Sequence, residues 1–195
     1  MARDVRRAER AVLEFLEALG FDPKNDAELR DTPARVAEAF STQLLNGYDV
    51  NLDALFSEGA VNASTSSGQW VLLADLNVAT VCPHHLLPAL GTATVGYVAG
   101  ERLFGLGALA GLVDALSRRL ILQEAIGEGV VEALMKHAGA RAAYCELTLT
   151  HSCLNARTPG REHSRVTTVA TSANLAPELL STLTLALGRQ KSDPS

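Results

Sequence analysis

The order of apolar and polar residues predicts two helices at the start of the chain. Residues 4–19 place apolar side chains at helical spacing on one face, and Gly20 follows them. A second helix is predicted to begin at Thr32-Pro33, with Thr32 as the N-cap, and to end at Asn46-Gly47. Residues 57–68 are rich in Ser, Ala, Asn and Gly without periodicity, so they are predicted to form a mobile loop.

The pattern changes after this loop, and the rest of the chain is predicted to form a sheet with two helices. The predicted strands are residues 69–80, 89–99, 142–152 and 164–173, and the predicted helices are 105–118 and 120–137. Because the strands come in pairs that are adjacent in sequence, antiparallel pairing is favoured, with the helices on one face. The sequence therefore predicts an α+β fold, with a ββααββ unit preceded by N-terminal helices.

Composition and net charge limit the kinds of binding partner and the location that can be expected for this chain. The chain is 47% hydrophobic, which is enough for a buried core, and its net charge of −5 argues against a general nucleic-acid or anionic-membrane surface. No apolar run is long enough to span a bilayer. Three cysteines and no signal peptide at the start favour a reducing, cytoplasmic location.

Two short segments carry the residues that are most typical of metal chemistry. Cys82-Pro83-His84-His85 and His151-Ser152-Cys153 together supply two thiols and three imidazoles. Thiolate and imidazole are the ligands that Zn²⁺ prefers, and a catalytic zinc usually keeps three protein ligands and one position for water. Five candidates for three positions leave two groups that could transfer protons.

Local geometry supports this grouping but does not fix the ligands. Residues 142–151 alternate like a half-buried strand, with Cys145 and His151 on one face. If extended backbone continues for two more residues, Cys153 joins that face. The two adjacent histidines cannot both point at one ion from extended backbone, so one can bind metal while the other faces a substrate. Taken singly, a cysteine is most often a small buried residue, and Cys145 is expected to be one.

Together these residues resemble the GTP cyclohydrolase I family. The similarity runs from Thr32-Pro33-Ala34-Arg35-Val36-Ala37 through Gly47-Tyr48 to the last strand. Its most specific parts are Cys82-x-His84-His85, Gly105-Leu106, Gln123-Glu124 and His151-x-Cys153-x-x-x-Arg157. The resemblance implies the tunnelling fold, in which ββααββ units assemble into closed barrels, typically a decameric toroid with sites at subunit interfaces. It divides the chain into an N-terminal helical extension, residues 1–56, and a catalytic domain, residues 57–195.

The resemblance implies a role for each matching residue. The implied zinc ligands are Cys82, His85 and Cys153, and the implied proton-transfer residues are His84 and His151. The implied substrate contacts are Gln123, Glu124, Leu106, Arg157 and Arg35. Among these, Gln123 and Glu124 would meet the guanine, with Glu124 accepting from its N–H groups, and the two arginines would contact the triphosphate.

The implied reaction converts GTP and water to 7,8-dihydroneopterin triphosphate and formate, in a pterin or folate-type pathway. Zinc can lower the pKa of water to roughly 7, which supplies the nucleophile that opens the imidazole ring. An imidazole, with an unperturbed pKa of about 6.5, can protonate the leaving ring nitrogen.

Several positions depart from the family pattern. The family usually has Ser, Lys and Arg where this chain has Gly107, Ala108 and Gly111, and Lys where it has Glu38. Pro83 replaces a usual Glu. Each charge-assisted contact to phosphate contributes about 1.5–3 kcal/mol, so the loss of three cations would weaken a triphosphate site considerably.

Three interpretations therefore remain open from the sequence. The first is the family reaction on GTP, with other arginines such as Arg102, Arg118, Arg119, Arg161 or Arg165 compensating. The second is the same zinc chemistry on a guanine derivative with fewer phosphates or none. The third is a non-catalytic paralogue that binds a pterin or purine.

Overall fold

The computed structural model describes residues 2–62, 70–100, 102–157, 159–161, 163–173 and 175–192. The N-terminal elements are α1 (Val5–Ala18), α2 (Thr32–Ala39), the π-helix η1 (Phe40–Leu44), the 3₁₀-helix η2 (Asn46–Asp49) and α3 (Leu52–Gly59). The strands are β1 (Ala60–Asn62), β2 (Trp70–Val81), β3 (Pro88–Val98), β4 (Arg102–Phe104), β5 (Ala142–His151) and β6 (Val166–Thr171). The remaining helices are α4 (Leu106–Ser117), α5 (Gln123–His137), α6 (Ser152–Asn155) and α7 (Pro177–Ser192).

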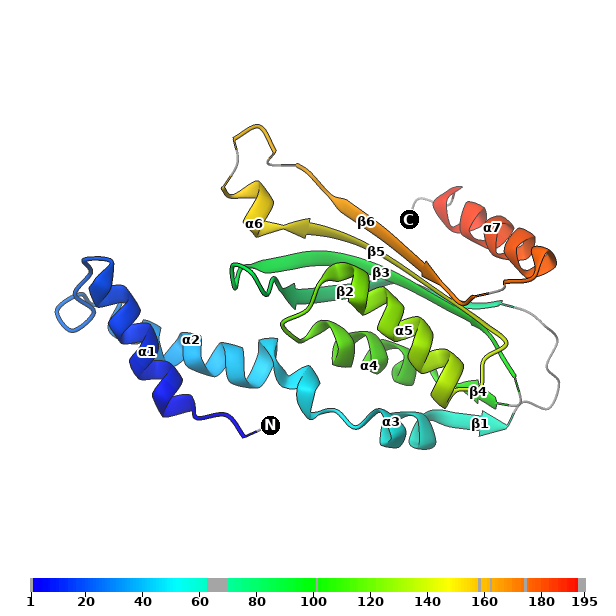
Figure 1. The fold of residues 1–195 in the computed structure, drawn as a ribbon, viewed down its shortest axis with the longest axis horizontal. Coiled ribbons are helices and arrows are strands. Elements are labelled where there is room, and N and C mark those ends of the chain that lie inside the picture. The colour runs from blue at the N-terminus through cyan, green and yellow to red at the C-terminus, as the bar shows by residue number, and fades with distance from the viewer. Residues whose placement is uncertain are drawn as a thin grey trace.

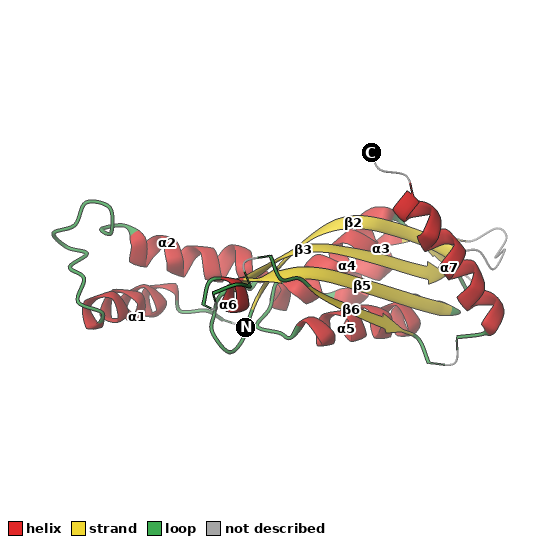
Figure 2. Cartoon of the chain, turned by 90° about the horizontal axis from the view of Figure 1, so that it is seen from above, coloured by secondary structure: helices red, strands yellow, loops and turns green. Residues whose placement is uncertain are grey.

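Four of these strands form one antiparallel sheet in the order β2-β3-β5-β6, and β1 pairs with β4 in a separate small sheet. The helices α4 and α5 lie on one face of the larger sheet (Figure 1). The C-terminal helix α7 crosses the opposite face (Figure 2), where Trp70 Nε1 at the start of β2 donates a hydrogen bond to Leu179 O at 2.9 Å. The predicted ββααββ antiparallel unit is therefore confirmed.

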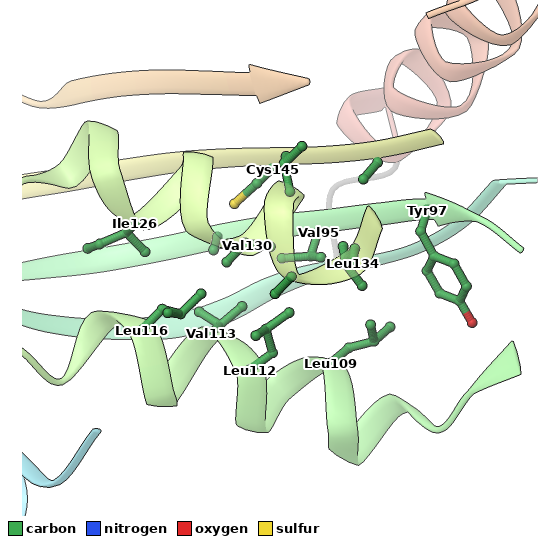
Figure 3. Packing of buried hydrophobic residues seen from close by; sticks show 14 of the residues in the cluster. Val95, Tyr97, Leu109, Leu112, Val113, Leu116, Ile126, Val130, Leu134 and Cys145 are labelled. Atoms are coloured by element: carbon green, nitrogen blue, oxygen red, sulfur yellow. The ribbon is translucent and has the colours of Figure 1, made fainter. Parts of the chain in front are cut away.

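The core lies between the sheet and the two helices that cover it (Figure 3). Apolar residues at helical spacing on α4 and α5 meet the alternating inward residues of β3 and β5, because each element has one apolar face to bury. The fully buried members include Val95, Leu109, Leu112, Ile126, Val130, Leu134, Cys145, Leu147 and Leu149. Cys145, which was expected to be a small buried residue, belongs to this cluster.

Substitution of Leu112 by alanine should lower the free energy of unfolding by about 2–5 kcal/mol, because the side chain is completely buried between α4 and the sheet. Urea denaturation followed by circular dichroism measures this. The matched control is Leu106→Ala at the start of the same helix, where the side chain is 57% exposed and the expected change is within about 0.5 kcal/mol. Equal losses in the two variants would contradict this description of the core.

The N-terminal segment differs from its prediction in two places. Asp31, not Thr32, is the N-cap residue, and Thr32 is the first residue of α2. The helix also does not continue as an α-helix to residue 45, because Leu45 N bonds to Phe40 O and the last turn widens to a π-helix. The hydroxyl of Thr42 bonds to Glu38 O in this region, a contact that competes with regular helix geometry.

The predicted loop at residues 57–68 is only partly accounted for. Its first residues complete α3 and form β1, which contradicts a loop there, and residues 63–69 lie outside the described part of the chain. The helix α3 is anchored through Phe56, which packs edge-on against Phe104, with ring centroids 5.1 Å apart, and stacks on His137. The division of the chain near residue 56 stays a prediction.

The helices α1 and α2 pack on each other and project beyond one end of the sheet (Figures 1 and 2). Among the described residues, no helix is both long and apolar enough to cross a membrane. The end of the sheet nearest these helices is the end where the β2–β3 turn and α6 lie (Figure 1), and the site described next is found there.

Candidate metal centre

The turn between β2 and β3 brings a cysteine and a histidine together. Cys82 N donates to Leu87 O and Leu86 N donates to Cys82 O, both at 2.9 Å, so the loop closes on itself. Leu86 has a φ of 54°, a left-handed conformation that non-glycine residues adopt rarely and that sharpens the turn. As a result Cys82 Sγ lies 3.7 Å from His85 Nδ1.

The end of β5 supplies the second segment, though not in the predicted way. Cys153 does not extend the strand: β5 stops at His151, and Ser152–Asn155 turn into the short helix α6. The change of direction follows the loss of a partner strand, because the pairing of β5 with β6 ends at Leu149. His151 still pairs with Ala89 of β3, so the two segments meet at the same end of the sheet.

Three side chains at this junction could hold a metal ion. The ligand atoms of Cys82, His85 and Cys153 all lie within 4.8 Å of one another. A tetrahedral zinc with Zn–S of about 2.3 Å and Zn–N of about 2.0–2.1 Å would separate its ligand atoms by roughly 3.6–3.8 Å. The 3.7 Å separation of Cys82 Sγ and His85 Nδ1 fits that spacing. Two thiols and one imidazole also leave one position of a tetrahedron for water or substrate.

The neighbouring histidine has a different position. The rings of His84 and His85 are 6.3 Å apart and inclined at 80°, so they face different directions, as expected for adjacent residues. His85 joins the two cysteines, whereas His84 lines a hollow beside them.

The thiol of Cys153 is perturbed by its surroundings. Burial raises its pKa above the ordinary value, and the adjacent Cys82 thiol raises it further, while the positive charge of Arg157 acts in the opposite direction. Because metal binds the thiolate, metal uptake at this site must displace protons and should weaken as the pH falls. The third cysteine differs in kind: burial raises the pKa of Cys145 to about 12, which keeps that thiol protonated in the core.

A hollow of about 250 Å³ opens beside the three ligand atoms. It is formed by the β2–β3 turn, the start of α5, the end of β5, α6 and the start of β6. Its polar lining residues are Thr80, Cys82, His84, Gln123, Glu124, His151 and Cys153. Its apolar wall consists of Pro83, Ala89, Ile121, Leu122, Leu154 and Val166. Six of the ten residues expected at the site therefore line one space, and His85 adjoins it.

Hydrogen bonds fix two of the lining residues. Gln123 is only 3% exposed, and its Oε1 lies 2.7 Å from His151 Nε2. Its Nε2 donates to Leu147 O, Val166 O and Thr168 Oγ1 at 2.9–3.1 Å. These bonds could not be read from the sequence, since the acceptors belong to two strands that reach Gln123 only in the folded chain.

Three expected substrate contacts lie outside this hollow. Leu106 begins α4 at the opposite end of the sheet (Figure 1) and is 57% exposed. Arg35 lies on α2, where its guanidinium is 3.1 Å from the carboxylate of Asp31. Arg157 is exposed just after α6, close enough for its charge to act on Cys153. Within one chain, the structure groups the expected metal and proton-transfer residues and leaves these three apart.

An antiparallel ββααββ sheet with two cysteines and a histidine gathered at one end defines the class, a tunnelling-fold protein with a candidate thiolate–imidazole metal site. A family model described as GTP cyclohydrolase I matches residues 8–181. The chain belongs to the GTP cyclohydrolase I family, which is a family of hydrolases.

Two relatives that are named GTP cyclohydrolase 1 agree with this assignment. The GTP cyclohydrolase 1 of Leifsonia xyli subsp. xyli is 34% identical over 173 residues, which cover 89% of this chain and 89% of that protein. The GTP cyclohydrolase 1 of Chromobacterium violaceum is 39% identical over 154 residues, which cover 77% and 71%. Among solved structures, the apo form of the archaeosine synthase QueF-Like aligns with a TM-score of 0.44 and 18% identity, over 58% of this chain and 100% of that one.

Proposed function

We propose that this chain is a zinc-dependent enzyme that converts GTP and water to 7,8-dihydroneopterin triphosphate and formate. The observation that carries the proposal is one hollow that adjoins three matched metal ligands and contains two further histidines and a carboxylate. A pure binding protein has no need of two further imidazoles next to a metal site.

Each residue of the hollow has a chemical task in this proposal. Cys82, His85 and Cys153 hold the zinc, which when bound supplies a nucleophilic water at neutral pH. His84 and His151 take the proton from the attacking water and return one to the departing ring nitrogen, since imidazole can do both near pH 7. Glu124 accepts hydrogen bonds from the N–H groups of the guanine, which selects against bases that lack them.

The phosphate contacts are proposed to come from more than one copy of the chain. Arg157 lies near the metal end of the sheet, whereas Arg35 and Leu106 lie outside the hollow of their own chain. In an oligomer with sites at subunit interfaces, a neighbouring copy would bring these residues in. The strands β2 and β6 are the two edges of the sheet and could pair between copies, which would close a barrel of the kind that a decamer contains. The three free cysteines are consistent with a cytoplasmic location.

Formate release from GTP by the zinc-loaded protein tests this proposal. The expected result is one formate for each pterin formed, and activity that disappears with a chelator and returns with zinc. Binding of GTP or a pterin without any formate would overturn the proposal and identify a non-catalytic paralogue.

A second candidate keeps the chemistry and changes the substrate to a guanine derivative with fewer phosphates or none. It is favoured by the packing of α3 on α4. A Cβ on Gly59 would lie 2.6 Å from Ala108 Cβ, and a Cβ on Gly111 would lie 3.2 Å from Leu55 Cδ1. Ala108 and Gly111 are positions where the family resemblance implies cations, and here their small size lets α3 lie against α4.

Two of the arginines named as possible replacements are already engaged. Arg118 pairs with Asp114 at 3.2 Å and donates to a backbone carbonyl of η1, and Arg119 donates to Ala115 O and Gly47 O. They hold η1 and η2 against α4. Turnover of GTP, GMP, guanosine and guanine by one zinc-loaded preparation distinguishes the candidates, because fastest turnover of GTP would exclude the second.

Restoring a cation at Gly111 should disturb this packing. Gly111→Arg must displace Leu55 and is expected to lower the free energy of unfolding by about 1–3 kcal/mol, as overpacking does. The control is Gly107→Arg, where a Cβ meets nothing within 4 Å and no loss from packing is expected. Denaturant titration of both variants measures the difference, and equal stability would show that α3 does not occupy this space.

A further inference from the structure

The side chain of Gln123 is placed as part of the chain's own hydrogen-bond network. It is the first residue of α5, it is 3% exposed, and its amide reaches between β5 and β6. Its Nε2 lies 3.1 Å from Leu147 O and 2.9 Å from Val166 O. Thr168 Oγ1 is a third acceptor at 3.1 Å. The family resemblance implies a contact between this residue and guanine, but both N–H groups of its amide already point at acceptors within the chain.

The two carbonyl groups fix which way the amide faces. A primary amide has two N–H donors on nitrogen and an oxygen that only accepts. The opposite orientation would place Oε1 against Leu147 O and Val166 O, so that acceptor would face acceptor, and a buried pair of that kind is unfavourable. Oε1 must therefore be the atom that faces His151 Nε2 at 2.7 Å.

The orientation of the amide determines the tautomer of the histidine. Because Oε1 can only accept, His151 Nε2 must carry the hydrogen of this bond. In a neutral imidazole the other nitrogen, Nδ1, then holds the free lone pair. A histidine without such a partner would exchange between two tautomers and two ring orientations.

We propose that Gln123 is a positioning residue that holds His151 as the Nε2–H tautomer, so that Nδ1 is the nitrogen that exchanges protons during the reaction. The proposal rests on the proposed function, because it assumes that His151 transfers protons. In each turnover Nδ1 accepts a proton from water and gives one to the departing ring nitrogen, while Nε2–H stays bonded to Gln123 throughout. Gln123 touches neither substrate nor metal in this role.

Nitrogen NMR of the zinc-loaded wild type tests the tautomer directly. The protein is labelled with ¹⁵N-histidine and measured at a pH at which a free imidazole is neutral. The signals of His151 are assigned by their loss in a His151→Ala spectrum. We expect a protonated Nε2 and an unprotonated Nδ1. The reverse assignment, or an even mixture of the two, would overturn the proposal.

The variant Gln123→Met tests the positioning role, because it keeps the length of the side chain and removes the amide. We expect kcat to fall about 10- to 100-fold, less than the 10²–10⁴-fold that a general acid–base group contributes, with KM and zinc content unchanged. A rise in KM at constant kcat would instead mean a substrate contact and would overturn the proposal. The matched control is Gln43→Met on the exposed surface of η1, for which neither parameter should change.

The two measurements separate this inference from the proposed function. If the wild type releases no formate, the proposed function fails, while the NMR result still decides which tautomer Gln123 imposes. If the wild type is active and Gln123→Met fails to fold, the tautomer of the wild type remains the deciding result.

Discussion

Replacing Cys153 with alanine is expected to abolish both stoichiometric metal binding and turnover. Among the described residues the site offers three protein ligands, and thiolate-rich zinc sites bind with about 10–16 kcal/mol, so one ligand accounts for roughly a third of that energy. A loss of about 3–5 kcal/mol in binding free energy raises the dissociation constant for the metal by about 10²–10⁴-fold. Elemental analysis of metal per chain, together with the formate assay, measures both effects.

The same substitution at the third cysteine provides the control. Cys145 is completely buried in the core, and its thiol stays protonated because burial raises its pKa to about 12. Cys145→Ala should therefore cost about 1 kcal/mol of stability and leave the metal content at one ion per site. Metal loss in this variant, or full metal retention in Cys153→Ala, would show that the ligand set is wrong.

The second large effect is expected from His151→Ala. Turnover should fall about 10²–10⁴-fold, because this imidazole has been proposed to transfer protons in the hollow. Metal content should not change, since His151 is not one of the three grouped ligands. Steady-state kinetics and elemental analysis of the same preparation measure the two quantities.

His163→Ala is the comparison for that variant. His163 is exposed and does not line the hollow, so both kcat and metal content should stay at their wild-type values. If His151→Ala loses its metal, then His151 is a ligand and the assignment of His85 must be reconsidered.

The sheet and its two covering helices were predictable because their periodicities are strong and long. The apolar stripes of α4 and α5 bury one face each, and β5 alternates as predicted from Cys145 onward, whereas Ala142–Cys145 are all buried, so both faces of the strand are covered there. The ends of elements were less predictable. The π-helix at Phe40–Leu44 depends on side-chain hydrogen bonds, and the end of β5 at His151 depends on where its partner strand ends. The spacing of apolar residues predicts neither.

The site could be predicted only in part for a related reason. The residues alone offered five candidates for three ligand positions, and only the family resemblance selected Cys82, His85 and Cys153. The hydrogen bonds of Gln123 could not be predicted from the sequence, because most of their acceptors are backbone carbonyls, which every residue has. The position of Leu55 over Gly111 was equally unpredictable, since a glycine in a helix does not reveal which neighbour requires its small size.

The origin of the grouped ligands has a consequence for folding as well as for chemistry. Cys82 and His85 come from the β2–β3 turn and Cys153 comes from α6, so a bound ion cross-links two turns that are distant in sequence. An ion that binds only the folded chain stabilises it by about 2.7 kcal/mol at a concentration a hundredfold above its dissociation constant. The thermal midpoint of this protein should therefore rise with free metal and fall when a chelator removes it.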